Sequence, residues 1–176
     1  VYGAVGKNYL VFNPNSFTAE GIVETENGKR FVKGAAPKGF SALPIQPLKN
    51  RLKLKPKQIE NDFFCIKFAN DYSIISIYDK RNKRQLVKKG QSANEFRIYE
   101  DLPMEYDAWE LRDYYIEKSY PVKDVVSAEV YLDGCTGGLM VVKKFGDSTI
   151  RQRIRIYEDI DRIDFETEAD WHSKHS

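Results

Sequence analysis

The sequence predicts an all-β fold, and three observations support this prediction. Short runs of β-branched and aromatic residues recur along the chain, separated by Gly, Asn, Asp and Pro. No segment keeps the apolar period of an amphipathic helix over three turns. Near the C-terminus, two stretches alternate charged and apolar residues with the period of two that a half-buried strand requires.

The predicted strands follow one another without an intervening helix. Between the early strands, Asn27-Gly28 predicts a type I′ hairpin turn, because both residues tolerate positive φ. Further along, the polar run 79–84 predicts a second hairpin turn. In chain order, we expect strands at residues 9–12, 21–24, 30–32, 41–45, 62–68, 73–78, 85–87, 95–100, 125–132, 138–145, 149–157 and 162–171.

The segment LKNRLKLKPK, residues 48–57, marks the clearest change of composition in the chain. Its alternation of leucine with basic residues would suit an edge strand, but the shift in composition makes it the best domain boundary. We therefore predict a small β-sandwich-like unit over residues 1–55 and a larger β unit over residues 56–176. The segment lacks interleaved aromatic residues for base stacking, so we interpret it as a solvated face.

The overall composition excludes several classes of protein. A length of 176 residues allows one domain or two small ones, and 28 basic against 26 acidic residues give a charge of only +2. We therefore expect no nucleic-acid partner. The apolar runs are too short to span a bilayer, so we expect no membrane association and no signal peptide. The isolated cysteines, Cys65 and Cys135, suit a reducing cytoplasm, and the start at Val1 suggests a piece of a longer protein.

The stretches 151–157 and 162–171 can be paired as an antiparallel hairpin with one charged and one apolar face. Opposite charges directly across such a pair contribute roughly 0.2–1 kcal/mol each. Trp171 continues the apolar face, so we expect it to pack in the core. The predicted register places Arg155 opposite Asp164, Arg153 opposite Glu166, Arg151 opposite Glu168, Ile156 opposite Ile163 and Ile154 opposite Phe165.

The two histidines of the chain, His172 and His175, follow this hairpin. On a strand, a spacing of three places them on opposite faces, so they would share a metal ion only after a turn. A complete zinc site would also need further ligands. Both histidines lie at the C-terminus, so no Ser-His-Asp triad is indicated, and the glycine-rich segment 134–138 predicts a turn between strands.

The loop MEYDAWELRDYY, residues 104–115, is the best candidate for a binding site. Long loops inside a compact domain are often functional. Aromatic faces beside carboxylates suit the C–H faces and hydroxyls of a sugar ring, which makes Asp107, Trp109 and Tyr115 the candidate substrate-binding residues. The alternative is that these aromatic side chains only cover the edge of the core.

Several blocks of the sequence resemble, in the same order, the region that follows the barrel in glycoside hydrolase family 38 α-mannosidases. The combination of YDAW with IDFETEADWH is the most specific part of this resemblance. The blocks are VFNPNSF at 11–17, ENDFFCIKF at 60–68, IISIYDKRNKRQLV at 74–87, ANEFRIYEDLPMEYDAWELRDYY at 93–115 and RIDFETEADWHSKH at 162–175.

The resemblance implies a large zinc-dependent retaining enzyme that removes α-linked mannose, with its zinc and its nucleophile in a catalytic barrel missing from this chain. It implies that this chain is a non-catalytic part: a small β-sandwich, then the first part of a galactose-mutarotase-like supersandwich. We expect no cofactor in this part, an intramolecular contact with the barrel, and Asp107, Trp109 and Tyr115 at the active-site rim. An exposed strand at 162–171 would favour a homodimer.

Two alternatives remain at the level of the sequence. The first is a stand-alone carbohydrate-binding module that uses the aromatic residues between Tyr106 and Tyr115. The second is an autonomous mutarotase-like enzyme. The chain length and the terminal position of the histidines argue against the second alternative.

Overall fold

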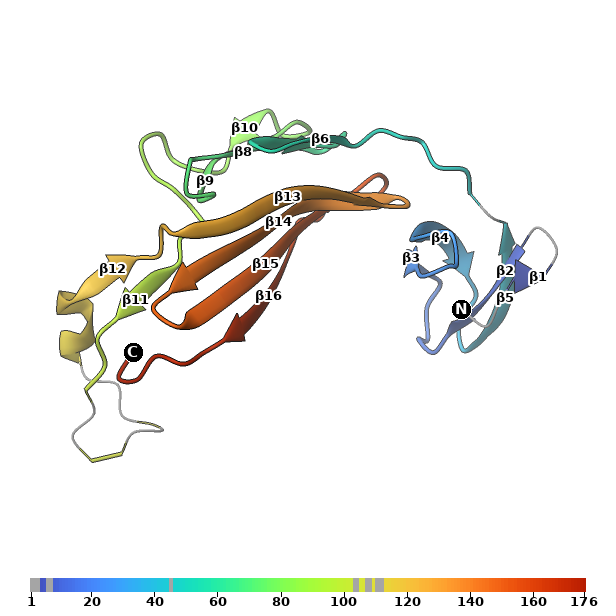
Figure 1. The fold of residues 1–176 in the computed structure, drawn as a ribbon. Helices are drawn as coiled ribbons and strands as arrows, with labels where there is room; N and C mark the ends of the chain where they lie inside the picture. The colour runs from blue at the N-terminus through green and yellow to red at the C-terminus, as the bar shows by residue number, and fades with distance from the viewer. Residues whose placement is uncertain (1–3, 6–7, 45, 103–104, 107–108, 110–112) are drawn as a thin grey trace.

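The computed structural model confirms the all-β prediction, with a small β-sandwich followed by a larger one (Figure 1). It describes residues 4–5, 8–44, 46–102, 105–106, 109 and 113–176. Within these residues all strand pairs are antiparallel, and the helical structure is limited to the short 3-10 helix η1 (Asp113–Glu117). In the described part of the chain, no helix is long and apolar enough to cross a membrane.

The small unit consists of a three-stranded sheet of order β1-β2-β5 and the hairpin β3-β4. Alternate residues of β2 face inward, because successive side chains of a strand point to opposite faces. The buried core of the unit is Tyr9, Val11, Val32, Ala35 and Leu43. Its strands are β1 (Ala4–Val5), β2 (Asn8–Asn13), β3 (Ala19–Val23), β4 (Arg30–Ala35) and β5 (Gly39–Pro44).

The type I′ turn predicted at Asn27-Gly28 is wrong. The amide of Gly28 donates to the carbonyl of Thr25, so Glu26 and Asn27 are the central turn residues. Only Gly28 has a positive φ in this turn, at 85°, whereas a type I′ turn needs positive φ at both central residues. The last strand pair is Val23 with Arg30, so the connection is longer than the two-residue loop that the sequence suggested.

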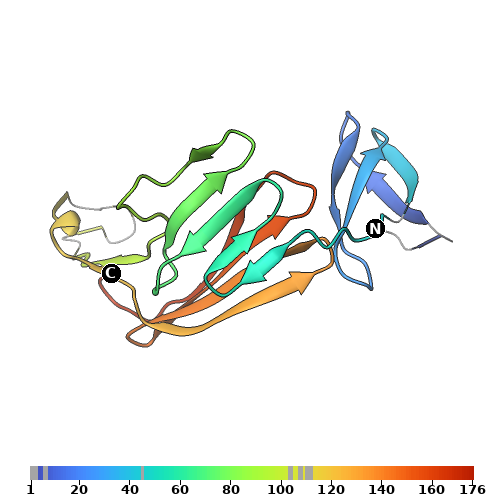
Figure 2. The ribbon, with the colours of Figure 1, turned by 90° about the horizontal axis from the view of Figure 1, so that it is seen from above.

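The larger unit packs a five-stranded sheet of order β10-β9-β8-β7-β6 on a four-stranded sheet of order β13-β14-β15-β16. Figure 2 shows the five-stranded sheet, in green, lying over the orange and red strands. Its strands are β6 (Lys53–Lys55), β7 (Gln58–Glu60), β8 (Phe64–Phe68), β9 (Ile74–Asp79), β10 (Arg84–Gln85), β13 (Val125–Asp133), β14 (Thr136–Phe145), β15 (Ser148–Tyr157) and β16 (Asp164–Asp170).

The core of the larger unit lies between these two sheets. Its members come from the inward faces of β7, β8 and β9 on one side and of β14 and β15 on the other. The side chains alternate inward and outward, as expected for sheets packed face to face. The buried members are Ile59, Ile66, Phe68, Ile74, Leu139, Val141, Ile154 and Ile156.

The alternating segment around Lys53 forms strand β6 at the edge of the five-stranded sheet. Lys53 and Lys55 are exposed, while Leu54 packs against the core. The strand pairs with β7, with Lys55 opposite Gln58, so the sheet begins before the predicted boundary at 55/56. The basic alternation therefore belongs to an edge strand whose lysines face solvent. The division into domains at that position stays a prediction.

The predicted register of β15 with β16 is confirmed for every pair that lies within the two strands. Arg155 stands opposite Asp164, Arg153 opposite Glu166 and Arg151 opposite Glu168, and on the other face Ile154 stands opposite Phe165. The ion pairs join Arg151 to Glu168 at 3.4 Å and Arg153 to Glu166 at 3.7 Å. Arg155 reaches Glu166 diagonally at 2.9 Å.

The prediction that the apolar face ending at Trp171 packs in the core holds for Ile163, which packs against the buried cluster, but is wrong for Phe165 and Trp171. Phe165 is 44% exposed and Trp171 is 39% exposed. Trp171 stacks on Phe145 instead, with ring centroids 6.4 Å apart. The reason is that β16 is the edge of its sheet and the buried cluster draws on β14 and β15.

Two turns from distant parts of the sequence meet where the small unit contacts the larger one. The amide of Cys135 donates to the carbonyl of Lys29 at 2.9 Å, and the Lys29 ammonium pairs with Asp133 at 2.7 Å. The backbones approach so closely that a Cβ on Gly134 would lie 1.9 Å from the Lys29 carbonyl oxygen, and one on Gly28 would lie 2.9 Å from Asp133. Both positions have positive φ, so glycine meets both the steric and the conformational requirement.

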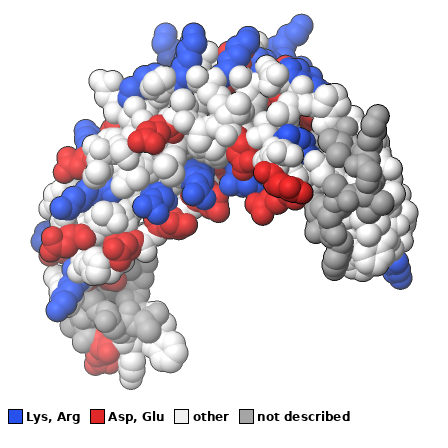
Figure 3. All heavy atoms as spheres, turned by 45° about the vertical axis from the view of Figure 1, so that its right-hand side comes forward, with Lys and Arg blue, Asp and Glu red and all other residues white. Residues whose placement is uncertain are grey.

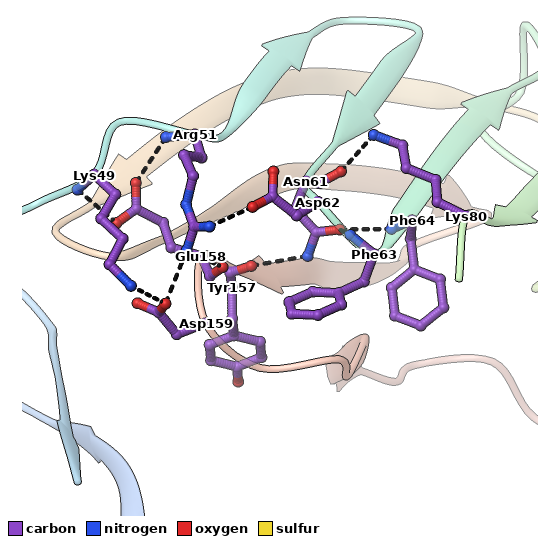
Figure 4. Close-up of polar contacts among 10 residues, drawn as sticks. All are labelled: Lys49, Arg51, Asn61, Asp62, Phe63, Phe64, Lys80, Tyr157, Glu158 and Asp159. Atoms are coloured by element: carbon purple, nitrogen blue, oxygen red, sulfur yellow. Dashed lines mark hydrogen bonds and ion pairs between the residues drawn. The ribbon is translucent and has the colours of Figure 1, made fainter. Parts of the chain in front are cut away.

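The carboxylate of Glu158, just after β15, ties the connection between the units to the four-stranded sheet (Figure 4). Glu158 is 2% exposed and accepts hydrogen bonds from the amides of Lys49 and Arg51 at 3.0 and 2.9 Å. The Arg51 guanidinium also donates to the Glu158 carbonyl and to Asp159. These bonds fix the irregular segment before β6 on the sandwich.

Asn61, which follows β7 of the five-stranded sheet, forms hydrogen bonds in the same region (Figure 4). Its side-chain amide donates to the carbonyl of Tyr157 at 2.8 Å, and its side-chain oxygen accepts from the amides of Phe63 and Phe64. Asn61 is 1% exposed, so it is a satisfied buried polar group that links the two sheets directly.

Replacement of Glu158 by alanine should lower the free energy of unfolding by roughly 2 kcal/mol, because it removes the acceptor of two backbone amides. Urea unfolding measures this loss. Amide hydrogen exchange should also speed up at Lys49 and Arg51. In the control Asp161→Asn, which removes an exposed ion pair with Arg81, the loss should be smaller than in Glu158→Ala. Unchanged exchange at both amides in Glu158→Ala would contradict the assignment.

The Lys29–Asp133 contact should make stability depend on pH. The hydrogen bond from Lys29 lowers the pKa of Asp133, and the same bond raises the pKa of Lys29. The contribution of Asp133 is therefore present above its unfolded pKa of about 3.9 and is lost as pH falls through its folded pKa. That of Lys29 is present below its unfolded pKa of about 10.4 and is lost as pH rises through its folded pKa.

We expect Asp133→Asn to be less stable than the unmodified chain by roughly 0.2–1 kcal/mol near pH 7. Urea unfolding should show this difference shrinking as pH falls below the unfolded Asp pKa of about 3.9 and through the lower folded pKa of Asp133. Glu20→Gln, which removes the exposed Lys33–Glu20 pair at 3.6 Å, is the matched control and should have a smaller effect near neutral pH. A difference between Asp133→Asn and the unmodified chain that does not change with pH would disprove the linkage.

Candidate functional site

The predicted binding loop is carried by a two-stranded ribbon at the end of the larger sandwich. Strand β11 (Arg97–Tyr99) pairs with β12 (Ser119–Pro121), and Ile98 stands opposite Tyr120. The ribbon holds both ends of the intervening loop, in which η1 is the regular element (Figure 1). The amide of Asp101 donates to the carbonyl of His175 at 2.9 Å, so the C-terminal segment supports the start of the loop.

Trp109 is the most exposed large apolar side chain of the described residues, at 82%. Its ring lies 6.4 Å from the ring of Tyr106, which is 58% exposed. Asp107, the predicted carboxylate partner, lies outside the described residues. Two exposed rings at one loop form a surface that can stack on an apolar face of a ligand.

Tyr115 has a different environment on η1. It is half-buried, and its ring contacts the ring of Tyr99 edge to face, with centroids 5.2 Å apart. Trp109 and Tyr115 therefore belong to two separate ring pairs. Tyr115 packs on Tyr99, and a role for Asp107, Trp109 and Tyr115 in sugar binding stays a prediction.

A small cavity of about 90 Å³ lies beside the ribbon. Its polar groups include the ion pair between Lys118 and Glu100 at 2.6 Å, and this contact raises the pKa of Lys118. The hydroxyl of Tyr114 donates to the carbonyl of Leu102. The lining residues are Glu100, Leu102, Tyr114, Glu117 and Lys118. This set offers donors and acceptors for a neutral polar group.

The terminal histidines do not converge on a metal site. The ring of His172 lies 3.0 Å from the Asp170 carboxylate, and its amide donates to Ser148. His175 has a φ of 56° and contributes its carbonyl to Asp101. Among the described residues, no group of three or more His, Cys, Asp or Glu side chains is arranged to hold a metal ion.

Neither cysteine is placed as a nucleophile. Both thiols are free, Cys135 is buried, and Cys65 is half-buried. Burial raises the pKa of Cys135 to about 11 and also raises the pKa of Cys65. At neutral pH both therefore remain thiols, and the thiolate is the reactive form.

One buried charge was missed by the sequence analysis. Lys143 is 3% exposed, on the inward face of β14. The signal was present in the sequence, because Lys143 and Lys144 are adjacent in a predicted strand and neighbouring side chains point to opposite faces. One of the two lysines had to point toward the other sheet.

The charged side chains are distributed unevenly over the surface. In Figure 3, lysine and arginine side chains line the upper edge of the molecule, and acidic and basic groups alternate below it. The upper edge in this view is therefore mainly basic, and the face below it carries both signs.

A comparison with protein families decides the classification. Residues 59–176 match the model described as the glycosyl hydrolases family 38 C-terminal domain. This chain belongs to glycoside hydrolase family 38. The matched range begins in β7 and includes the four-stranded sheet and the ribbon with its loop. The resemblance that the sequence blocks indicated is therefore confirmed.

Several relatives carry the name of the family's enzymes. The chain is 25% identical to human "Alpha-mannosidase 2C1" and 28% identical to the mouse protein of the same name, over 66% of its own length. It is 21% identical to "Alpha-mannosidase G" of Dictyostelium discoideum, over 94% of its own length. The aligned regions span only 12% of the human and mouse proteins and 19% of the Dictyostelium protein.

The two ring pairs of this family 38 chain should respond differently to truncation. Trp109→Ala should change the free energy of unfolding by less than about 0.5 kcal/mol, because the side chain is exposed. Tyr115→Ala should cost roughly 1–2 kcal/mol, because it removes a half-buried ring from its contact with Tyr99. Thermal unfolding measures both changes. Tyr115→Phe is the matched control that keeps the ring, and equal losses for Trp109→Ala and Tyr115→Ala would contradict this distinction.

Proposed function

We propose that this chain is a non-catalytic β region of a zinc-dependent, retaining α-mannosidase that releases α-linked mannose from glycans. In this proposal the chain packs on a catalytic barrel and shapes the rim of the active site. The barrel supplies the zinc and the nucleophile. We also propose a cytoplasmic location, because free cysteines suit a reducing compartment.

The observation that carries the proposal is the family match over residues 59–176, which coincides with nearly all of the larger sandwich. The names of the relatives add the substrate class, α-linked mannose. The chain corresponds to less than a fifth of the length of these relatives, so the remaining length of such a protein has room for a catalytic domain.

The exposed apolar side chains support a contact with a further domain. Phe165 on the edge strand β16 and Trp109 on the ribbon loop remain open to solvent in the chain. Exposed apolar groups of this size often mark interaction surfaces. A rim position for the loop would place Asp107, Trp109 and Tyr115 near substrate, and the free edge of β16 is the feature that a homodimer would use.

A second candidate is a stand-alone carbohydrate-binding module. The exposed pair Trp109 and Tyr106 favours it, because aromatic faces stack on sugar rings without help from another domain. In this alternative, the chain alone binds mannosides, and Trp109→Ala removes that binding.

The deciding experiment compares hydrolysis of an aryl α-mannoside by the chain and by the full-length parent protein, both with added zinc. We expect hydrolysis by the parent only. In the parent, replacement of Asp107, Trp109 and Tyr115 one at a time should raise KM or lower kcat if the loop lies at the rim.

Two outcomes would count against the proposal. Hydrolysis by the chain alone would place the catalytic groups within it. Unchanged kcat and KM for all three substitutions would show that the loop does not lie at the rim. Even then, activity confined to the parent protein would still support a non-catalytic role for this chain.

A further inference from the structure

A second cavity, of about 150 Å³, lies beneath the base of the ribbon and has no role in the proposed function. It is formed where the inward face of β14 meets the turn between β8 and β9 and the ends of β11 and β12. The lining residues are Asp71, Glu95, Phe96, Arg97, Pro121, Val122, Lys123 and Lys143.

Lys143 places a buried ammonium group at this cavity. The side chain is 3% exposed, its Nζ donates to the carbonyl oxygen of Val122 at 3.2 Å, and Nζ lies 5.5 Å from the centre of the Phe96 ring. An ammonium group has three donors. Among the described residues, the carbonyl of Val122 is the one hydrogen-bond partner of Nζ, and Lys143 forms no ion pair. Two donors are therefore available to a molecule in the cavity.

Asp71 supplies an acceptor that is held in a fixed orientation. Its Oδ1 accepts hydrogen bonds from the amide and the hydroxyl of Ser73 at 3.1 and 2.7 Å. Burial acts against ionisation, but the bonds from Ser73 and the charge of Lys143 together lower the pKa of Asp71. Glu95 adds a second carboxylate, 3.9 Å from Arg97.

The arrangement of charges defines the class of ligand. Opposite charges of Lys143 and Asp71 face the same cavity without direct contact between them, and each influences the pKa of the other. The lining carries both signs, with the carboxylates of Asp71 and Glu95 and the basic side chains of Arg97, Lys123 and Lys143. A ligand of either charge would therefore be attracted by some of these groups and repelled by the others. A neutral hydroxyl suits groups of both signs, because it accepts from the ammonium and donates to the carboxylate.

The apolar part of the lining favours a ring over a small open-chain molecule. The Phe96 ring and Pro121 lie beside the polar groups. Pockets that combine a few fixed polar groups with an aromatic face hold the hydroxyls and the C–H face of a sugar ring at the same time.

We propose that the Lys143 cavity binds one neutral polyhydroxylated ring, a monosaccharide unit, through a hydroxyl shared between Lys143 and Asp71. This site is separate from the loop that carries Trp109. It does not rest on the proposed function, because it is built from residues of this chain alone.

The test is an NMR titration of the isotopically labelled chain with methyl pyranosides. Methyl α-D-mannopyranoside, methyl α-D-glucopyranoside and methyl β-D-galactopyranoside are the neutral ring probes, while glycine and sodium acetate are the zwitterionic and anionic probes. The signals followed are the Lys143 ε-methylene group and the amides of Ser73 and Val122. At least one pyranoside should shift all of these signals with saturation, with a Kd on the order of 1 mM.

Substitutions separate this site from its neighbours. Lys143→Met keeps the length of the side chain, removes its donors and should weaken binding at least about 10-fold. Asp71→Asn, which keeps an acceptor for Ser73, should weaken binding by a similar factor. The controls Lys144→Met, which changes the exposed neighbouring lysine, and Trp109→Ala should bind as the unmodified chain does.

Three outcomes would overturn the proposal. The first is the absence of saturable shifts with all three pyranosides at concentrations on the order of tens of millimolar. The second is equal binding by Lys143→Met and the unmodified chain. The third is binding of glycine or acetate at the same signals with equal affinity. Binding that is lost in Trp109→Ala but kept in Lys143→Met would instead support the carbohydrate-binding module, whatever the outcome of the mannoside hydrolysis assay.

Discussion

The face-to-face packing of two antiparallel sheets is the constraint on which the larger unit depends. Ile59 and Ile66 on one sheet and Leu139 and Ile154 on the other are fully buried, and together they hold the layers at the spacing that side chains of this size allow. This packing brings the end of β14 under the ribbon β11-β12. The loop and the Lys143 cavity are therefore positioned by the same core.

The contacts between the units depend on backbone geometry more than on apolar area. The two turns at Gly28 and Gly134 meet because neither carries a side chain, and the Lys29–Asp133 pair lies beside them. Glu158 then satisfies the amides of the connecting segment (Figure 4). Polar groups that are fixed and satisfied in this way confer a defined arrangement at a small net gain in stability.

The accuracy of the sequence analysis depended on whether each feature was local. The register of β15 with β16 was predicted because both faces of the hairpin carry a pattern of period two, and a slip of one residue would invert it. The same pattern misassigned Phe165 and Trp171, since alternation identifies an apolar face but does not reveal whether another layer covers it. In the predicted binding loop, Tyr106 and Trp109 are exposed and Tyr115 packs against Tyr99, while the binding role of the loop stays a prediction.

The sequence by itself determined the β class, most strand positions and the family, because these follow from short-range alternation, turn residues and ordered blocks. Only the tertiary structure showed that Lys143 and Asp71, which are 72 positions apart in the sequence, line the same cavity. It alone also showed that the amide of Arg51 donates to Glu158. Such pairs arise from how the sheets stack and where the turns meet. The alternation of side chains along a strand determines which face of the sheet a residue points to. The residue that it contacts there depends on how strands that are distant in the sequence pack together.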